Sequence, residues 1–327
     1  MKVLVTGGLG FTGTHLVEHL LEKGLEVVAL DNQKGLFYDA LLKKGVKIVL
    51  GSVTDRNILK ESLKGVEGVF HLAAAFRKIN ASKKEYRDVN IEGTRALCEE
   101  CLSLNLKKFV YCSTQGIHGN IDNPPGDETS PVKPEDYYQF TKYEGEKVVK
   151  EFAAKGLKSI ILRPMAIYGP GDPARFLHLF KFAKEGKFYM FGNGSAFYHP
   201  LYVDNLSDAF YLAFVSKITN GEEYLIGDNE FFHIKDLVKK VGESMGIDVK
   251  IINLPFLPLY IAACICEAIC VPLRIPPPLF RRRVDWFRQN RAFKIDKAKR
   301  DIGYNPKVGI EEGLKRTLEW YKANNFL

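Results

Sequence analysis

The sequence predicts a doubly wound α/β fold, in which a parallel sheet carries helices on both faces, followed by a second, smaller α/β domain. Two observations predict this fold. Short runs rich in β-branched residues alternate with longer amphipathic segments through the first half of the chain, a pattern typical of a parallel sheet. After Pro164 the pattern changes to Gly- and Pro-rich loops and shorter elements. We therefore divide the chain into residues 1–164 and 165–327.

The strands of the first domain are expected where the β-branched runs occur. These runs are residues 2–6, 26–31, 47–50, 68–72, 108–113 and 159–163. Amphipathic segments at 13–23 and 89–104 are expected to be helices, and Gly24 stands where a helix commonly ends in a left-handed residue. A further run at 223–226 is a candidate strand that returns to the main sheet from the second domain.

Composition restricts the class of protein. With 327 residues and 46% hydrophobic side chains, the chain can bury a substantial core and is not expected to be disordered. The net charge of +8 arises from 47 basic and 39 acidic side chains, and basic residues gather at 281–283 and 288–300. We interpret them as solvated faces, with an anionic substrate or acidic lipid as alternatives. No nucleic-acid-binding motif accompanies the charge, so a nucleic-acid partner is not expected.

Six cysteines are present, two of them close together at Cys98 and Cys101 within a helical segment. Neither a second pair nor a histidine cluster has zinc-like spacing, so no metal site is predicted and reduced, buried thiols are expected. The apolar start of the chain is too short for a signal peptide, which favours a cytoplasmic location.

The segment 254–273 is strongly apolar, but prolines and Glu267 interrupt it. A membrane-spanning helix needs about 20 nearly continuous apolar residues. This segment is instead expected to line an apolar cavity, to rest on a membrane face, or to form ordinary core or a dimer contact.

The first strand runs directly into Gly7-Gly-Leu-Gly10-Phe-Thr-Gly13, and a helix follows. Glycines at this place permit a tight turn and a close approach of the backbone to a pyrophosphate, which the helix N-terminus attracts. The next strand ends in Asp31, at about the 20-residue distance expected for an acid that binds the adenosine ribose. The pattern therefore predicts a Rossmann-type dinucleotide site.

Asp31 favours NAD over NADP, because a carboxylate binds ribose hydroxyls and repels a 2′-phosphate. Its neighbours Asn32 and Gln33 supply no arginine, although Lys34 follows. The structural alternative is that Asp31 caps a helix.

Tyr138 and Lys142 stand four residues apart, so on a helix they share one face, which Glu146 continues. Oxidation of a secondary alcohol requires a base near its hydroxyl, and a free tyrosine with a pKa of about 10 is a poor base at neutral pH. A nearby ammonium favours the phenolate. Tyr138 is thus a candidate acid/base and Lys142 its partner.

Over nearly its full length the chain resembles the extended short-chain dehydrogenases. The matching pieces follow in the family's order, namely Gly7 to Gly13, Asp31, His71-Leu-Ala-Ala74, Asn90 with Gly93-Thr94, Ser113-Thr114, Tyr138 with Lys142, and Arg163-Pro164 with Tyr168-Gly-Pro170.

The resemblance implies that Thr114 hydrogen-bonds the substrate oxygen, Tyr138 exchanges its proton and Lys142 holds the nicotinamide ribose. It also implies a homodimer through helices at 89–104 and 138–153, and a second domain that mainly binds the substrate. The implied cofactor contacts are Gly7, Gly10, Phe11, Thr12, Gly13, Asp31, Asn32, Ser52, Val53, Leu72, Ala73, Ala74, Asn90, Tyr138, Lys142 and Pro164. Ser52 stands where many relatives have an aspartate.

Departures from the family patterns bear on the reaction. Dehydratases follow the catalytic Thr with an Asp-Glu pair, where this chain has Gln115-Gly116. Sugar-nucleotide epimerases commonly place a diphosphate-binding arginine where this chain has Tyr198, although Arg175, Arg281 or Arg288 are candidate substitutes.

The C-terminal third resembles the 3β-hydroxysteroid and sterol dehydrogenases, in the apolar segment 259–271, the basic stretch, and segments 296–306 and 312–320. The first functional hypothesis is NAD-linked oxidation of a secondary alcohol on a bulky, partly apolar small molecule. The second is nucleotide-sugar 4-epimerisation with retained NAD. The third, a non-catalytic NAD-binding regulator, is disfavoured because Thr114, Tyr138 and Lys142 are all present. His118 and His199 are either auxiliary acids or, more commonly for single histidines, structural residues.

Overall fold

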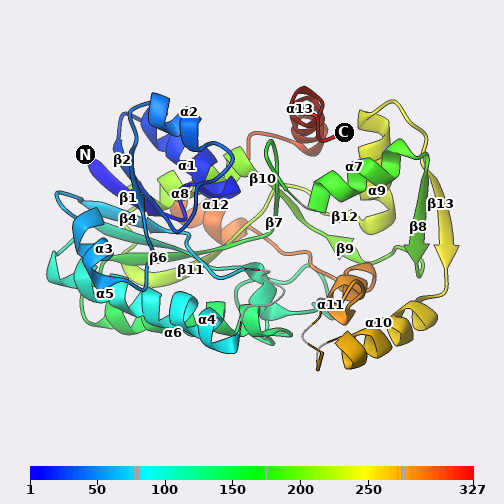
Figure 1. The fold of residues 1–327 in the computed structure, drawn as a ribbon, viewed down its shortest axis with the longest axis horizontal. Helices are drawn as coiled ribbons and strands as arrows, with labels where there is room; N and C mark the ends of the chain where they lie inside the picture. Colours follow the sequence, from blue (N-terminus) through cyan, green and yellow to red (C-terminus); the bar gives the residue numbers. More distant parts are fainter. Residues whose placement is uncertain (77–81, 174, 271, 274, 276) are drawn as a thin grey trace.

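The computed structural model describes residues 1–76, 82–173, 175–270, 272–273, 275 and 277–327. Within these residues, seven strands form one parallel sheet in the order β3-β2-β1-β4-β5-β6-β11 (Figure 1). The strands are β1 (Lys2–Thr6), β2 (Glu26–Asp31), β3 (Lys47–Leu50), β4 (Gly68–His71), β5 (Lys108–Cys112), β6 (Ser159–Pro164) and β11 (Asn220–Ile226). This arrangement confirms the predicted doubly wound, Rossmann-type α/β fold.

Helices cover both faces of the sheet (Figure 1). One face carries α1 (Phe11–Glu22), α8 (Val203–Val215) and α12 (Asp296–Ile302), and the other carries α3 (Arg56–Ser62), α5 (Thr94–Ser103) and α6 (Tyr137–Ala154). Alternate residues of β1 divide between the two cores, with Val3 and Val5 on the α1 side and Leu4 on the α6 side. The period of two in a strand thus explains why its sequence is continuously apolar.

Helix boundaries differ in detail from the sequence expectation. Helix α1 ends before Gly24, whose φ of +77° is the left-handed conformation expected at that position. The helix predicted at 89–104 is preceded by α4 (Lys83–Arg87) and begins as a π-helical segment, η1 (Asp88–Gly93), before α5. The shorter elements of this half are α2 (Tyr38–Lys43) and the 3₁₀ turn η2 (Gln115–His118).

A second lobe packs around its own core and stands beside the carboxyl ends of the strands (Figure 1). Its strands form the pairs β7 with β10, β9 with β12 and β8 with β13. Their bounds are Ala166–Tyr168 (β7), Lys187–Phe191 (β8), Phe197–Tyr198 (β9), Pro200–Tyr202 (β10), Phe232–His233 (β12) and Lys250–Leu254 (β13). The remaining helical elements are α7 (Arg175–Lys184), α9 (Ile234–Ser244), α10 (Phe256–Cys270), α11 (Arg281–Val284), η3 (Asp285–Phe287) and α13 (Ile310–Ala323).

The two halves of the chain are interwoven. After β10, the chain returns through α8 to β11, which pairs in parallel with β6 at the edge of the main sheet. It then leaves again through β12 and α9. The run at 223–226 therefore lies within a strand of the main sheet, although it follows much of the second lobe in sequence.

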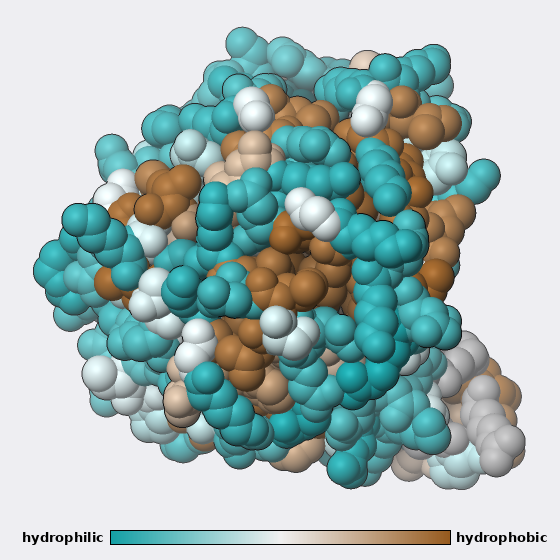
Figure 2. All heavy atoms as spheres, turned by 90° about the vertical axis from the view of Figure 1, so that its left-hand side faces the viewer, coloured by the Kyte–Doolittle hydropathy of each residue, from teal (hydrophilic) through white to brown (hydrophobic). Residues whose placement is uncertain are grey.

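The surface on the left-hand side of Figure 1 is a mixture of hydrophilic side chains and smaller apolar areas (Figure 2). In the part of the chain that the structure describes, no helix is long and apolar enough to span a membrane. Cys98 and Cys101 are buried free thiols on α5, and among the described residues no cluster of His, Cys, Asp and Glu is arranged to hold a metal ion.

Candidate active site

A cleft of about 770 Å³ lies where the carboxyl ends of the parallel strands face the second lobe. It is next to the point between β1 and β4 at which the strand order reverses, where open parallel sheets bind their ligands. Of the residues predicted for the site, the cleft is lined by Gly7, Gly10, Phe11, Thr12, Gly13, Asp31, Asn32, Ser52, Val53, Leu72, Ala73, Ala74, Thr114, Tyr138 and Pro164. The structure places Asn90 and Lys142 behind this wall, both buried.

The glycine loop between β1 and α1 is tightly folded on itself. Gly7 has a φ of +71°, and a Cβ added to Gly13 would lie 1.9 Å from the carbonyl oxygen of Gly7. A Cβ on Gly10 would meet only that same oxygen, at 3.4 Å. Gly10 is the N-cap residue of α1, and no side chain at this position bonds the first-turn amides of the helix. These amides can therefore donate hydrogen bonds to a pyrophosphate in the cleft.

The side chain of Asp31 lies at the end of β2 and is fixed by backbone donors. Its carboxylate accepts hydrogen bonds from the amides of Leu9 (3.1 Å) and Gln33 (3.4 Å). Burial raises the pKa of Asp31, although these backbone donors oppose the shift. The nearby ammonium of Lys34 lies over the ring of Tyr38, 4.7 Å from its centroid, and Lys34 is not among the cleft-lining residues.

The middle of the cleft wall is the loop after β4, which two buried side chains hold. The hydroxyl of Thr6 accepts a hydrogen bond from the Ala73 amide and also bonds His71. Asn90 accepts a hydrogen bond from the Ala75 amide (2.8 Å) and donates to the Ala75 carbonyl oxygen (3.2 Å) and to the hydroxyl of Thr141 (2.9 Å). In this structure Asn90 therefore shapes the cofactor wall and joins it to α6.

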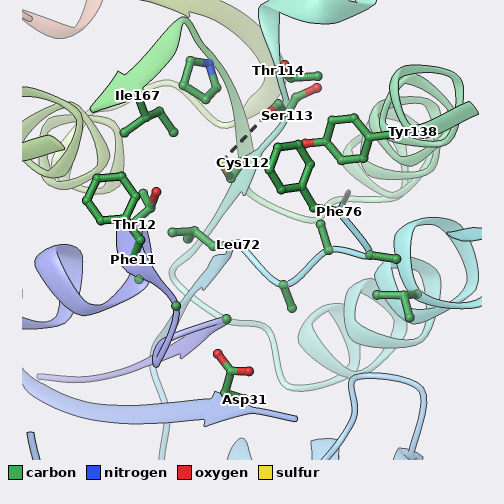
Figure 3. A pocket seen from close by; sticks show the side chains of 18 of the residues that line it. Phe11, Thr12, Asp31, Leu72, Phe76, Cys112, Ser113, Thr114, Tyr138 and Ile167 are labelled. Atoms are coloured by element: carbon green, nitrogen blue, oxygen red, sulfur yellow. Dashed lines mark hydrogen bonds between the residues drawn. The ribbon is translucent and has the colours of Figure 1, made fainter. Parts of the chain in front are cut away.

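The candidate catalytic hydroxyls converge at one end of the cleft. Figure 3 shows Ser113, Thr114 and Tyr138 at that end and Asp31 at the other. Thr114 caps η2, where its hydroxyl accepts a hydrogen bond from the Gly116 amide (3.1 Å). The ring of Tyr138 lies against that of Phe76, with 4.8 Å between the centroids.

Lys142 lies one helical turn after Tyr138 and is only 2% exposed. Its ammonium lies over the ring of Tyr111, 4.2 Å from the centroid. Burial lowers the pKa of Lys142 to about 8, because a low-dielectric environment disfavours the charged form.

A buried ion pair stands behind the catalytic helix. Glu146 on α6 accepts hydrogen bonds from Nε and Nη2 of Arg163 on β6, at 2.9 and 2.7 Å. His118 lies 3.4 Å from Nη1 of Arg163 and also bonds the carbonyl oxygens of Ser130 and Pro131. This network joins η2, which Thr114 caps, to α6 and β6, which carry Tyr138 and Pro164.

The two histidines considered as auxiliary acids do not line the cleft. Both are buried, and burial lowers the pKa of each, to about 4 for His199. His199 bonds the carbonyl oxygen of Asp228 at 2.8 Å. Their contacts are those of structural residues.

Several cleft residues were not predicted from the sequence. Ser113 is 3% exposed and its hydroxyl has no hydrogen-bond partner among the described residues, so it is available to a bound molecule. Arg291 arrives from the basic stretch that the sequence suggested is solvated. The other additions are Leu30, Gln33, Gly51, Ala75, Phe76, Glu85, Val89, Cys112, Gln115, Gly116, Gln139, Met165, Ile167, Asp172 and Pro173. The position of Ser113 next to the predicted Thr114 was a sequence signal that could have identified it as a site residue. No sequence feature indicated that Arg291 would line the cleft.

Two of the three arginines considered as diphosphate partners, Arg281 and Arg288, do not line the cleft. Arg281 bonds Glu267, and Arg288 lines a separate cavity of about 240 Å³ together with Phe256 and Phe287. The side chain of Arg175 lies outside the described part of the structure. Segment 176–199 is mostly α7 and β8, because its apolar residues pack into the second core.

The fold, the glycine loop and the Tyr138–Lys142 helix together define an enzyme of the extended short-chain dehydrogenase class. Residues 3–227 match the model of the NAD dependent epimerase/dehydratase family. The chain therefore belongs to this family, whose members are NAD-dependent oxidoreductases, epimerases or dehydratases, and the resemblance identified from the sequence is confirmed.

Individual relatives cover nearly the whole chain. A 2-alkyl-3-oxoalkanoate reductase of Stenotrophomonas maltophilia is 31% identical, over 97% of this chain and 98% of its own. The 3beta-hydroxysteroid-dehydrogenase/decarboxylase isoform 1 of Arabidopsis thaliana is 29% identical, over 98% of this chain and 80% of its own. The structure of a UDP-glucose 4-epimerase from Thermotoga maritima superposes with a TM-score of 0.81 at 28% identity, over 99% of this chain and 100% of its own.

Proposed function

We propose that this protein is an NAD-dependent oxidoreductase that interconverts a secondary alcohol and a ketone on a bulky, partly apolar substrate. The observation that carries the proposal is the single cleft that joins the glycine loop and Asp31 to Thr114 and Tyr138. The glycine loop and Asp31 line one part of this cleft and the two hydroxyls line another, so a bound dinucleotide would present its reactive end to Thr114 and Tyr138.

Each residue at that end has a defined part in the proposed reaction. Thr114 donates a hydrogen bond to the substrate oxygen, and Tyr138 removes or returns the proton on that oxygen. The buried ammonium of Lys142 favours the phenolate form of Tyr138. NAD, when bound, supplies the hydride acceptor.

The apolar character of the substrate is supported by the side chains at the reactive end. Phe76 and Ile167 line this part of the cleft together with Tyr138 (Figure 3), and Met165 also lines the cleft. Apolar walls with a few polar groups are typical of sites for hydrophobic small molecules. The names of the Arabidopsis and Stenotrophomonas relatives, a hydroxysteroid dehydrogenase and an oxoalkanoate reductase, support the same substrate class.

NAD is proposed over NADP on local charge. The Asp31 carboxylate would repel a 2′-phosphate, and Asn32 and Gln33 beside it are uncharged. The ammonium of Lys34 lies over the ring of Tyr38.

Nucleotide-sugar 4-epimerisation is the second candidate. Arg291 favours it, because a guanidinium in the cleft can bind a diphosphate, and the similarity to the Thermotoga epimerase is consistent with it. Dehydration is disfavoured, since the cleft has Gln115 and Gly116 after Thr114, where elimination requires an acid.

The nucleotide content of freshly purified, undialysed protein distinguishes the two candidates. A dehydrogenase must exchange its cofactor, so we expect an empty or substoichiometric site that binds added NAD reversibly. Addition of hydroxysteroids and long-chain secondary alcohols should then generate NADH absorbance at 340 nm. Stoichiometric NAD that survives gel filtration, together with interconversion of UDP-sugars without net NADH, would replace the first proposal by the second.

A further inference from the structure

A polar side chain next to the candidate catalytic tyrosine lines the cleft but has no part in the reaction proposed above. Gln139 follows Tyr138 on α6 and is only 4% exposed. Its Oε1 accepts a hydrogen bond from the Glu135 amide at 2.7 Å. Because a backbone N–H needs an acceptor, this bond fixes which end of the Gln139 carboxamide is the oxygen. The other end, Nε2, is therefore a hydrogen-bond donor.

The Nε2 donor of Gln139 lies near the hydroxyl of Thr114. Both atoms are 3.3 Å from the point that a Cβ on Gly116 would occupy, so they are separated by at most twice this distance. In the described part of the chain, the Glu135 amide is the only hydrogen-bond partner of the Gln139 side chain. Burial of a donor without an acceptor is unfavourable, so this position fits a bound molecule that supplies an acceptor.

The two residues that flank Thr114 also bring unpaired polar atoms to the cleft wall. Ser113, which Figure 3 shows beside Thr114, is 3% exposed, and Gln115 is 6% exposed. Among the residues that the structure describes, the Ser113 hydroxyl and Oε1 of Gln115 have no hydrogen-bond partner. With Gln139, three buried polar side chains thus surround the hydroxyl proposed to bind the reacting oxygen. An isolated alcohol or ketone has too few polar atoms to bond them all.

Gln139 is held in place by contacts that reach the C-terminal part of the chain. The carboxylate of Glu135, whose amide bonds Gln139, accepts a hydrogen bond from Nε2 of Gln289 at 2.7 Å. The same carboxylate lies 3.7 Å from the guanidinium of Arg291, which also lines the cleft. A donor that is already fixed loses little conformational entropy when a ligand binds. Gln139 is therefore suited to discriminate between ligands.

The reacting oxygen does not account for this donor. In the reaction proposed above, Thr114 and Tyr138 both bond that oxygen, and together they use the two lone pairs of a carbonyl. We propose that Nε2 of Gln139 donates a hydrogen bond to a second substrate oxygen, on a carbon close to the reacting one. The substrate is then a ketone or alcohol with a neighbouring carbonyl group rather than an isolated ketone or alcohol. This inference rests on the alcohol–ketone function proposed above.

Binding of two matched ketones tests the inference without the need for turnover. Methyl 3-oxooctanoate and decan-5-one have the same chain length on both sides of the ketone and differ in the ester group beside it. Isothermal titration calorimetry with the full chain saturated with oxidised NAD gives the affinity for each, since neither ketone can be reduced under this condition. We expect the wild type to bind the oxo ester about 3- to 10-fold more tightly, the usual contribution of one hydrogen bond.

Two variants of Gln139 separate its donor from its structural bond. In Gln139→Glu, one carboxylate oxygen still accepts from the Glu135 amide, and the other replaces the donor by an acceptor. This variant should lose the preference for the oxo ester and keep its affinity for decan-5-one within about twofold. Gln139→Met, which has no donor, should bind both ketones equally. The matched control is Glu144→Gln, the reverse exchange on the same helix, at a residue that pairs with Lys147 and does not line the cleft. Circular dichroism establishes that each variant is folded.

Three results would overturn the inference. One is equal affinity of the wild type for the two ketones, and another is a preference that both Gln139 variants retain. The third is a loss of NAD affinity in Gln139→Glu with an unchanged preference, since this would assign Gln139 to the cofactor. The proposed function fails in a different way. If NADH reduces neither ketone while the binding preference depends on Gln139, the site for a second oxygen stands and the redox reaction is rejected.

Discussion

The carboxylate of Glu146 and the guanidinium of Arg163 form a two-pronged ion pair in which the side chains are 1% and 2% exposed. The pair joins the helix that carries Tyr138 to the strand that ends in Pro164. Both charges of a buried pair have lost their hydration. Removal of one partner leaves the other charge buried and unpaired, which costs more stability than replacement of both partners by apolar side chains.

Glu146→Gln is expected to destabilise the protein by about 3 kcal/mol, because the buried Arg163 guanidinium loses its two-pronged partner and is left with the longer contact to Glu223, at 3.5 Å. Urea denaturation measures the change. Glu151→Gln is the control, since Glu151 forms exposed pairs on the same helix and should cost at most about 1 kcal/mol. Equal effects of the two variants would show that the buried pair is not special.

Two glycines of the loop between β1 and α1 are expected to have different roles, Gly13 in folding and Gly10 in NAD binding. Gly13→Ala should destabilise the apoprotein by at least about 1–3 kcal/mol, because its Cβ would collide with the Gly7 carbonyl. Gly10→Ala has room in the apoprotein and should fold normally but bind NAD weakly, since the new methyl enters the pyrophosphate position. Thermal unfolding and NADH titration measure the two effects. Gly309→Ala, where a Cβ meets nothing within 4 Å, is the neutral control. A Gly10→Ala variant with normal NAD affinity would contradict the site.

Lys142 is expected to make stability depend on pH. Its pKa is lowered from 10.5 to about 8 by burial, so the folded state binds fewer protons than the unfolded state between these values, and the buried ammonium opposes folding most strongly below pH 8. Lys142→Met should therefore stabilise the apoprotein by on the order of 3 kcal/mol at pH 7. This gain should shrink as the pH rises from 8 toward 10.5.

Denaturation at pH 7, 8.5 and 10 measures this dependence, with the exposed Lys217→Met as the control. A stability difference between wild type and Lys142→Met that stays constant over this range would refute the buried ammonium.

Asp31 is expected to select the cofactor. Asp31→Ser/Asn32→Arg should weaken NADH binding about 10- to 100-fold, through loss of hydrogen bonds to a charged acceptor, and should strengthen NADPH binding. Fluorescence titration with both cofactors measures the ratio. Lys34→Ala should leave that ratio nearly unchanged, because this lysine stacks on Tyr38. Unaltered preference in the double variant would remove Asp31 from the cofactor site.

Tyr138→Phe should retain NAD binding and stability but lower turnover by about 10²- to 10⁴-fold, the usual contribution of a general acid/base. Tyr137→Phe, one residue earlier on α6, should keep normal turnover. Steady-state kinetics on a substrate found by the screen, with NADH titration alongside, makes the comparison. Unimpaired turnover of Tyr138→Phe would reject its assignment as the acid/base.

The sequence predicted the elements of the nucleotide-binding half closely. The expected runs 2–6, 26–31 and 47–50 coincide with β1, β2 and β3, and the glycine loop lies between β1 and α1. These features are local, because side-chain periodicity and glycine placement act over a few residues. For the same reason Thr114, Tyr138 and Asp31 could be proposed in advance, and all three line the cleft.

Tertiary structure alone decided what surrounds those residues. Arg291 lines the cleft although it belongs to the basic stretch near the C-terminus. Asn90 accepts a hydrogen bond from the Ala75 amide behind the cleft wall. Glu146 on α6 pairs with Arg163 on β6. Such relationships depend on contacts between distant segments, and these exist only once the whole chain has packed.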